Sequence, residues 1–159
     1  MNIRKAEAKD ADQIMALLSD ILELHARIRP DIFIPGTTKY TEEELLTIIS
    51  NDETPVYIAV NDDDEMMGYV FCIIQDPPFI TNMVQFKTLF IDDFGVVEKF
   101  RGQHIATEMF EFVKEEAKRR GCYDVTLNVW EGNDNARKFY DSMGMKVKET
   151  QLEYVLDED

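Results

Sequence analysis

A basic, glycine-bearing turn is the first part of this sequence whose residue types could do chemistry. From Val96 to Thr107 a β-rich run stops, a turn with Arg101 and Gly102 follows, and a helical pattern begins. The first N–H groups of a helix lack partners within the helix, and the helix dipole is positive there, so a phosphate group fits. Gly102 and the small Ala106 would let a ligand approach the backbone closely. The segment is neither a P-loop nor the glycine-rich dinucleotide motif, and taken alone it is also typical of an ordinary strand–helix connection.

A second group of candidate residues follows about thirty positions later, in the pattern Asn133-x-x-Ala136-x-x-Phe139-Tyr140-x-x-x-Gly144. On a helix, Ala136 and Tyr140 are neighbours four residues apart, so the small side chain leaves space beside the phenol. The pattern has a structural alternative, in which Phe139 and Tyr140 are core aromatics and Asn133 is only a helix N-cap.

Composition excludes several classes of protein. The 159 residues are 45% hydrophobic, which suits one domain with a proper core. The longest apolar stretches run only a few residues, far short of the ~20 that span a membrane. The N-terminal residues 1–7 contain no apolar region, so no secretory signal is expected. Cys72 and Cys122 stand far apart and outside any CxxC pair, which excludes a disulfide scaffold or a cysteine zinc site and predicts a cytoplasmic protein.

The net charge of -15 argues against a nucleic-acid or anionic-membrane partner. The charge is uneven, because ten basic and nine acidic residues lie between Glu98 and Lys148, which leaves a net charge of -16 on the rest of the chain. This uneven charge fits either solvated helix faces or a local anion site, between Glu98 and Lys148, on a protein that otherwise favours cationic ligands.

Hydrophobic periodicity predicts one mixed α/β domain over residues 1–156, followed by an acidic tail at 157–159. Strands are expected at Met1–Ala6, Pro55–Val60, Met67–Ile74, Lys87–Val97, Asp124–Trp130 and Met145–Leu156. Helices are expected from a capping box at Asp10 to Arg29, from a second capping box at Thr41 to about Ser50, from about Gln103 to Arg120, and from about Asn133 to Gly144.

In this order and spacing, the two motifs resemble those of the GNAT superfamily of acyl-CoA-dependent N-acetyltransferases. The family's Arg/Gln-x-x-Gly-x-Gly/Ala motif aligns with residues 101–106, and its Asn-x-x-Ala-x-x-Phe-Tyr-x-x-x-Gly-Phe motif aligns with residues 133–145. Met145 replaces the usual Phe, and His104 replaces the first glycine, where a Cβ could crowd the pyrophosphate. The resemblance implies a mixed, mostly antiparallel central sheet of about six to seven strands, flanked by about four helices and splayed at its two central strands.

The resemblance also implies roles in acetyl transfer, with acetyl-CoA as co-substrate and no metal. Backbone amides of Val96 and Val97 would polarise the thioester carbonyl. Tyr140 would be the general acid, since a phenol with a pKa of about 10 can protonate a thiolate whose conjugate acid has a pKa of about 8.5. Asp93 would relay the proton of the amine or hold its ammonium, whereas alternation along the strand directs Asp92 to the opposite face. The expected cofactor-binding residues are Val96, Val97, Arg101, Gly102, Gln103, His104, Ile105, Ala106, Thr107, Asn133 and Ala136.

The acyl acceptor is poorly specified by the sequence. The acidic remainder of the surface favours a cationic primary amine, such as a polyamine, an aminoglycoside, a lysine side chain or a protein N-terminus. His25 and Phe33 lie where relatives build the acceptor-side wall and are the expected substrate-binding residues. Relatives often pair as dimers, so a homodimer is expected from the resemblance. A non-catalytic acyl-CoA-binding or protein-interaction domain on the same fold is the alternative, although Tyr140, Asn133 and Arg101 favour the enzyme.

Overall fold

A computed structural model describes residues 1–156, so the acidic tail expected at 157–159 lies outside the described residues. The chain divides into two compact units, Met1–Asn128 and Val129–Asp159. Within the described range, no helix combines the length and the apolar character that crossing a membrane requires.

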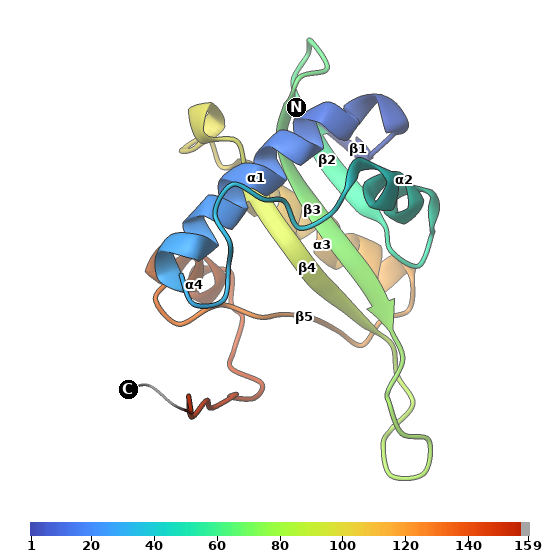
Figure 1. The fold of residues 1–159 in the computed structure, drawn as a ribbon. Helices are drawn as coiled ribbons and strands as arrows, with labels where there is room; N and C mark the ends of the chain where they lie inside the picture. Colours follow the sequence, from blue (N-terminus) through green and yellow to red (C-terminus); the bar gives the residue numbers. More distant parts are fainter. Residues whose placement is uncertain (157–159) are drawn as a thin grey trace. The chain divides into compact units, whose positions relative to one another are not determined.

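The first unit contains a sheet whose five strands follow one another in the order of the sequence, β1-β2-β3-β4-β5 (Figure 1). The strands are β1 (Asn2–Lys5), β2 (Val56–Val60), β3 (Met66–Gln75), β4 (Thr88–Val96) and β5 (Asp124–Leu127). Neighbouring strands from β1 to β4 are antiparallel, whereas β5 pairs with β4 in parallel. The mixed, mostly antiparallel sheet is confirmed, but the described residues form five strands instead of six to seven.

Helices cover both faces of this sheet. Helices α1 (Ala11–Ile28) and α2 (Glu42–Ser50) lie on one face, and α3 (Ile105–Arg119) lies on the other (Figure 1). The core on the α1 and α2 face is fully buried and apolar, with Ile14, Leu17, Leu18, Leu45, Ile58, Tyr69 and Phe71 among its members. On the other face, the rings of Tyr57 and Phe112 meet edge to face at 5.1 Å.

The helix ends show where local sequence decides structure. Thr41 and Glu44 form the predicted capping box of α2, in which the Thr41 side chain accepts from the Glu44 N–H at 3.1 Å and the Glu44 carboxylate accepts from the Thr41 N–H at 3.0 Å. Helix α1 ends at Ile28, close to the predicted boundary before Pro30. Helix α3 begins later than predicted, at Ile105.

The capping box predicted at Asp10 is wrong. Asp10 is 2% exposed, and its two carboxylate oxygens accept hydrogen bonds from the Arg4 guanidinium at 2.8 and 3.0 Å. It also accepts from the Glu7 N–H at 2.8 Å. Gln13 does not complete a box, since its side-chain oxygen accepts from the backbone N–H of Met66 at 2.9 Å. The bidentate ion pair with Arg4 is stronger than a neutral cap, and it closes the turn before the helix.

The pairing of β4 with β5 stops halfway along β4. Residues Thr88–Ile91 pair with Asp124–Leu127, but β4 continues to Val96. Among residues 1–156, no strand pairs with this edge of β4 beyond Ile91. Beyond Ile91, β4 and β5 are therefore no longer paired, as expected for the splayed strands that the family resemblance implied.

The second unit contains α4 (Asp134–Ser142), which is followed by Gly144 at φ +90°. No strand forms over residues 145–156, so the strand predicted there is wrong. In the described part of this unit α4 is the only helix or strand, and a strand requires a neighbour to accept and donate its backbone hydrogen bonds.

Gly68 and Gly95 let neighbouring groups pack closely against opposite faces of the sheet. We expect alanine to destabilise the fold to different extents at these two positions. A Cβ on Gly68 would lie 2.8 Å from the Gly95 carbonyl oxygen and 3.0 Å from the Met109 sulfur. A Cβ on Gly95 would meet only side-chain atoms, the nearest being the terminal methyl of Ile21 at 2.2 Å. Because backbone cannot move as a side-chain end can, we expect Gly68→Ala to cost about 1–3 kcal/mol of unfolding free energy, and Gly95→Ala to cost about 1 kcal/mol. Urea unfolding of both variants measures this, and an equal or reversed order would contradict it.

Candidate functional site

A β-bulge interrupts β4 where its two aspartates stand. Phe71 of β3 is opposite Asp93, while the next residue, Cys72, is opposite Ile91, so Asp92 is an extra residue on β4. A bulge interrupts the alternation of side chains along a strand. The prediction that Asp92 and Asp93 point to opposite faces is therefore wrong, as the contacts of both carboxylates demonstrate.

Asp92 binds the loop between α1 and α2. Its Oδ2 accepts a hydrogen bond from the Tyr40 hydroxyl at 2.7 Å and lies 3.0 Å from the Lys39 Nζ. Lys39 also donates to the backbone oxygen of Asp92 at 3.4 Å. The Tyr40 ring stacks on Phe71 of β3, with the ring centres 5.8 Å apart. Burial and the nearby Asp92 raise the pKa of the Tyr40 hydroxyl, so this hydroxyl is a hydrogen-bond donor at neutral pH.

Asp93 lies on the same face and, like Asp92, is half-buried. Burial raises the pKa of the Asp93 carboxyl to about 6; the charge of Lys39 opposes this rise, while that of Asp92 adds to it. Hydrogen bonding with the Tyr69 hydroxyl and the Phe94 N–H also lowers this pKa. The Tyr69 hydroxyl is fully buried and makes no hydrogen bond of normal geometry with residues 1–156, so its interaction with Asp93 falls short of a regular hydrogen bond.

The expected acceptor wall adjoins these aspartates. The His25 and Phe33 rings are in contact, with centres 5.3 Å apart. Burial lowers the pKa of His25, and the positive charge of Lys39 lowers it further. Lys39 is thus near His25 as well as Asp92. His25 and Phe33 therefore lie on the side of the sheet that holds the two aspartates.

The open edge of β4 presents one of the two amides predicted to face the thioester. The Val97 N–H donates to the Met67 carbonyl oxygen at 2.8 Å, so it is turned toward β3. Amides alternate between the two sides of an antiparallel strand, which directs the Val96 N–H to the opposite, open edge. The prediction that Val97 also polarises a carbonyl through its amide is wrong, and Val96 keeps that role as a prediction.

The turn after β4 leads into an uncapped helix. Gly102 has φ +81° and His104 has φ +62°, a turn conformation of the kind that gathers backbone N–H groups around anions. No side chain caps the first turn of α3, which contains Ala106 and Thr107. His104 is in the left-handed region, where a Cβ is unfavourable, and this explains the glycine of the family motif at that position.

The charge at this turn comes from Arg101. The Arg101 residue is exposed, and its guanidinium makes no hydrogen bond or ion pair with another residue in the described range 1–156. Its neighbour Lys99 is paired with Glu65, so its charge is already compensated. Arg101 is therefore the cation available to an anion bound at the start of α3.

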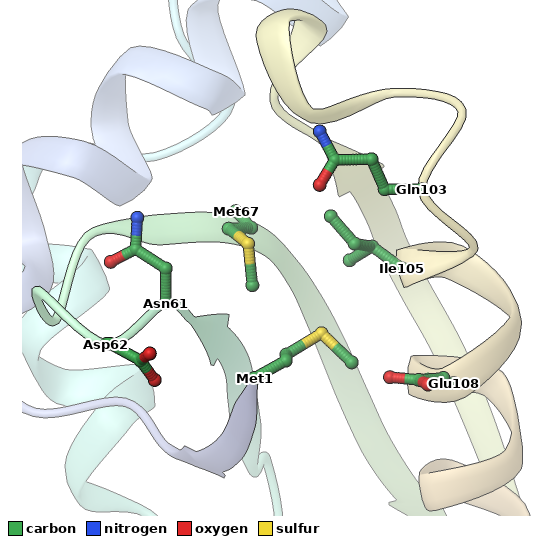
Figure 2. Close-up of a pocket in the computed structure, with 7 residues that line it drawn as sticks. All are labelled: Met1, Asn61, Asp62, Met67, Gln103, Ile105 and Glu108. Atoms are coloured by element: carbon green, nitrogen blue, oxygen red, sulfur yellow. The ribbon is translucent and has the colours of Figure 1, made fainter.

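A pocket of about 310 Å³ lies between β3 and the start of α3. Figure 2 shows Ile105 and Met67 facing each other, with Gln103 above them and the carboxylates of Asp62 and Glu108 on opposite sides. These carboxylates make the pocket unsuitable for a diphosphate. The buried Ile105 side chain faces this pocket, so only its backbone can serve the predicted anion site.

The remaining predicted residues lie on α4, in the second unit. Asn133 is the N-cap, and its side-chain oxygen accepts from the Ala136 N–H at 3.4 Å. This is the structural role left open by the sequence. Ala136 and Tyr140 are four residues apart on the helix as predicted, and the Tyr140 ring contacts Phe139 with the ring centres 5.3 Å apart.

Sequence reasoning missed Lys39 and Tyr69. Neither stands in a recognisable motif, because the bulge that gathers their partners, Asp92 and Asp93, leaves no pattern in the sequence. Among residues 1–156, no group of three His, Cys, Asp or Glu side chains is arranged to hold a metal ion.

The raised pKa of the half-buried Asp93 predicts a specific dependence of stability on pH. Its pKa is about 6 in the folded chain against an ordinary 3.8, so the folded state holds the proton more tightly. The folded chain therefore loses stability as pH rises from 3.8 to about 6, by at most about 3 kcal/mol. Asp93→Asn removes this loss, so we expect its stability relative to the wild type to increase over that range and then level off. Urea unfolding at a series of pH values measures the difference, and a constant difference would contradict the burial of Asp93.

Comparison with known proteins agrees with this architecture. A solved structure of a mutant BH1408 protein from Bacillus halodurans has a TM-score of 0.93 and 27% identity, covering 98% of this chain and 99% of that chain. The CoA complex of aminoglycoside N-acetyltransferase AAC(6')-Iy has a TM-score of 0.70 and covers 97% and 98% of the two chains; at 16% identity it shows the shared fold.

Sequence relatives point the same way. The uncharacterised N-acetyltransferase YdgE of Bacillus subtilis (strain 168) is 32% identical over 92 residues, which are 58% of this chain and 55% of that protein. The chain spans about half the length of the curated relatives it matches. The model of the acetyltransferase (GNAT) family matches residues 18–145, most of the sequence and both of its motifs. This chain belongs to the GNAT acetyltransferase family.

Proposed function

We propose that this protein transfers an acetyl group from acetyl-CoA to a primary amine of a cationic small molecule, peptide or protein, through a single N-acetyltransferase domain over residues 1–156. The observation that carries the proposal is the continuity of β4 with α3. A strand edge that has no strand partner in residues 1–156 is followed by the short 3-10 helix Glu98–Phe100, by a glycine-containing turn and by the uncapped start of α3.

The start of α3 fits the diphosphate of acetyl-CoA. Its first N–H groups lack a side-chain cap, and a helix of this length has a positive N-terminal end. Arg101 would add a full positive charge at the edge of the site. A Cβ at Gly102 would meet no atom within 4 Å, so this glycine is needed for its positive φ rather than for space within the chain.

The transfer requires three groups. The amine loses a proton, its nitrogen attacks the thioester carbon, and the carbon–sulfur bond breaks. The Val96 amide would stabilise the developing negative charge on the carbonyl oxygen. Asp93 would hold the ammonium or accept its proton, and Tyr140 would donate a proton to the leaving thiolate. The role of Tyr140 comes from the family motif, whereas the burial of Asp93 supports its part independently.

The surroundings of Asp93 support a cationic acceptor. Two carboxylates share one face of β4, and the single Lys39 ion pair compensates only one of these charges. An acceptor ammonium placed there would supply the second positive charge. His25 and Phe33 would form the wall beside it.

Cellular setting and assembly are part of the same proposal. Both cysteines are free thiols, which supports a reducing compartment such as the cytoplasm. The net charge of -15 favours neither nucleic acid nor an anionic membrane as a partner. A homodimer is proposed on the family resemblance alone.

Thermal unfolding with increasing acetyl-CoA tests the cofactor site. A ligand at ~100 times its dissociation constant adds about 2.7 kcal/mol to folding stability, so a dose-dependent rise in Tm is expected. His104→Gly should bind acetyl-CoA more tightly, because it removes the Cβ that could crowd the pyrophosphate and suits the positive φ of this position. No shift for either protein would support the non-catalytic alternative with a protein partner. A shift for His104→Gly alone would mean that His104 has closed the site.

Replacing Tyr140 tests the general acid. We expect Tyr140→Phe to lower kcat on the order of 10²-fold, within the usual range for general acid catalysis, while the Tm shift with acetyl-CoA is retained. Release of CoA thiol in the presence of an amine panel measures the rate. Tyr123→Phe is the matched control, because it removes a hydroxyl from a tyrosine that is 73% exposed on the first unit. An unchanged rate for Tyr140→Phe would remove this residue from the acid role.

A further inference from the structure

Lys39 presents a primary amine at the place proposed for the acceptor. Its Nζ lies 3.0 Å from the Asp92 carboxylate, and its charge acts on the pKa of Asp93. It also approaches the β4 backbone, since it donates to the Asp92 carbonyl oxygen at 3.4 Å. An acceptor ammonium held by these carboxylates would lie beside this amine.

The loop that carries Lys39 is fixed in a manner that keeps this amine there. The neighbouring Tyr40 donates to the same Asp92 oxygen at 2.7 Å, and its ring stacks on Phe71. The side chain of Lys39 remains 39% exposed, whereas that of Asp92 is 19% exposed. The amine is therefore both held at the bulge and open to the solvent side, as an acceptor would be.

We propose that Lys39 is a site of self-acetylation, in which the enzyme transfers an acetyl group from bound acetyl-CoA to its own Lys39 when no external amine occupies the acceptor position. The inference rests on the proposed function, because it uses the same carboxylates and the same acetyl donor.

The reaction is the proposed transfer with an internal nucleophile. The Lys39 ammonium loses a proton to Asp93, a bond forms between Nζ and the acetyl carbon, and the bond from that carbon to sulfur breaks. The nitrogen loses its second proton as the amide forms, and the leaving thiolate takes up one proton. The products are N-acetyl-lysine at position 39, CoA and one proton released to solvent.

Acetylation would change the site that produced it. An amide carries no charge, so the ion pair of Lys39 with Asp92 would be lost. The two carboxylates would then have no compensating charge from this loop. The pKa of Asp93 would rise, because Lys39 is a group that lowers it. The site would hold an external cation more strongly after modification.

The test is incubation of the purified protein with acetyl-CoA and no added amine, followed by peptide mass mapping over time. Lys5 is the internal control, because its Nζ is also 3.0 Å from a carboxylate, that of Asp52, and is more exposed. We expect Lys39 to gain one acetyl group at least about tenfold faster than Lys5, because a positioned amine reacts as an intramolecular group. The rate should be independent of protein concentration.

Two variants and one binding measurement make the outcome decisive. Asp92→Asn, which weakens the hold on the amine, should slow labelling of Lys39 without altering that of Lys5. Lys39→Arg should remove the label without transferring it to another lysine. Equal labelling of Lys39 and Lys5, in a sample whose Tm rises with acetyl-CoA, would overturn self-acetylation while leaving cofactor binding intact. Absence of both the Tm shift and the labelling would overturn the proposed function itself.

Discussion

The bulge at Asp92 is the constraint on which the candidate site depends. It occurs in β4 immediately after Ile91, the last residue of that strand paired with β5. One extra residue there changes the direction of side chains, and beyond it no strand of residues 1–156 pairs with β4 on the β5 side. The bulge thus brings two carboxylates to one face at the point where the open edge with the Val96 amide begins. A regular strand would separate these features.

By placing Asp92 and Asp93 on one face, the bulge makes the charged form of Asp93 less favourable, and Lys39 partly offsets this effect. Burial of Asp93 favours its neutral form, and the carboxylate of Asp92 adds to this effect. Lys39 is the nearby cation that acts against both, and it belongs to a loop with no regular structure. Tyr69 adds only a weak interaction, because its buried hydroxyl makes no regular hydrogen bond within residues 1–156. The electrostatic state of the buried carboxylate thus depends on a loop contact that is itself partly exposed to solvent.

Sequence reasoning succeeded where local chemistry decides the outcome. The box of Thr41 and Glu44 forms because both partners lie within one turn and no other group competes for them. The equivalent prediction at Asp10 failed because the guanidinium of Arg4, from the neighbouring strand, binds both of its oxygens. The bulge at Asp92 was missed for a similar reason, since it depends on the register between two strands. Motifs predicted the turn at Gly102 and the helix of Tyr140, whereas contacts between distant segments placed Lys39.

In the proposed function, an acidic chain binds an acidic cofactor. Its net charge of -15 opposes the approach of a diphosphate, so the attraction must be local. Lys99 contributes little, because Glu65 already compensates its charge. In the proposed function the attraction would rest on Arg101 and on the backbone of α3, whose N–H groups keep their orientation whatever the surrounding charge. His104 bears directly on this backbone, because its left-handed conformation sets the direction in which the helix begins. The proposed affinity for the diphosphate would therefore depend on backbone geometry at this turn more than on side-chain charge.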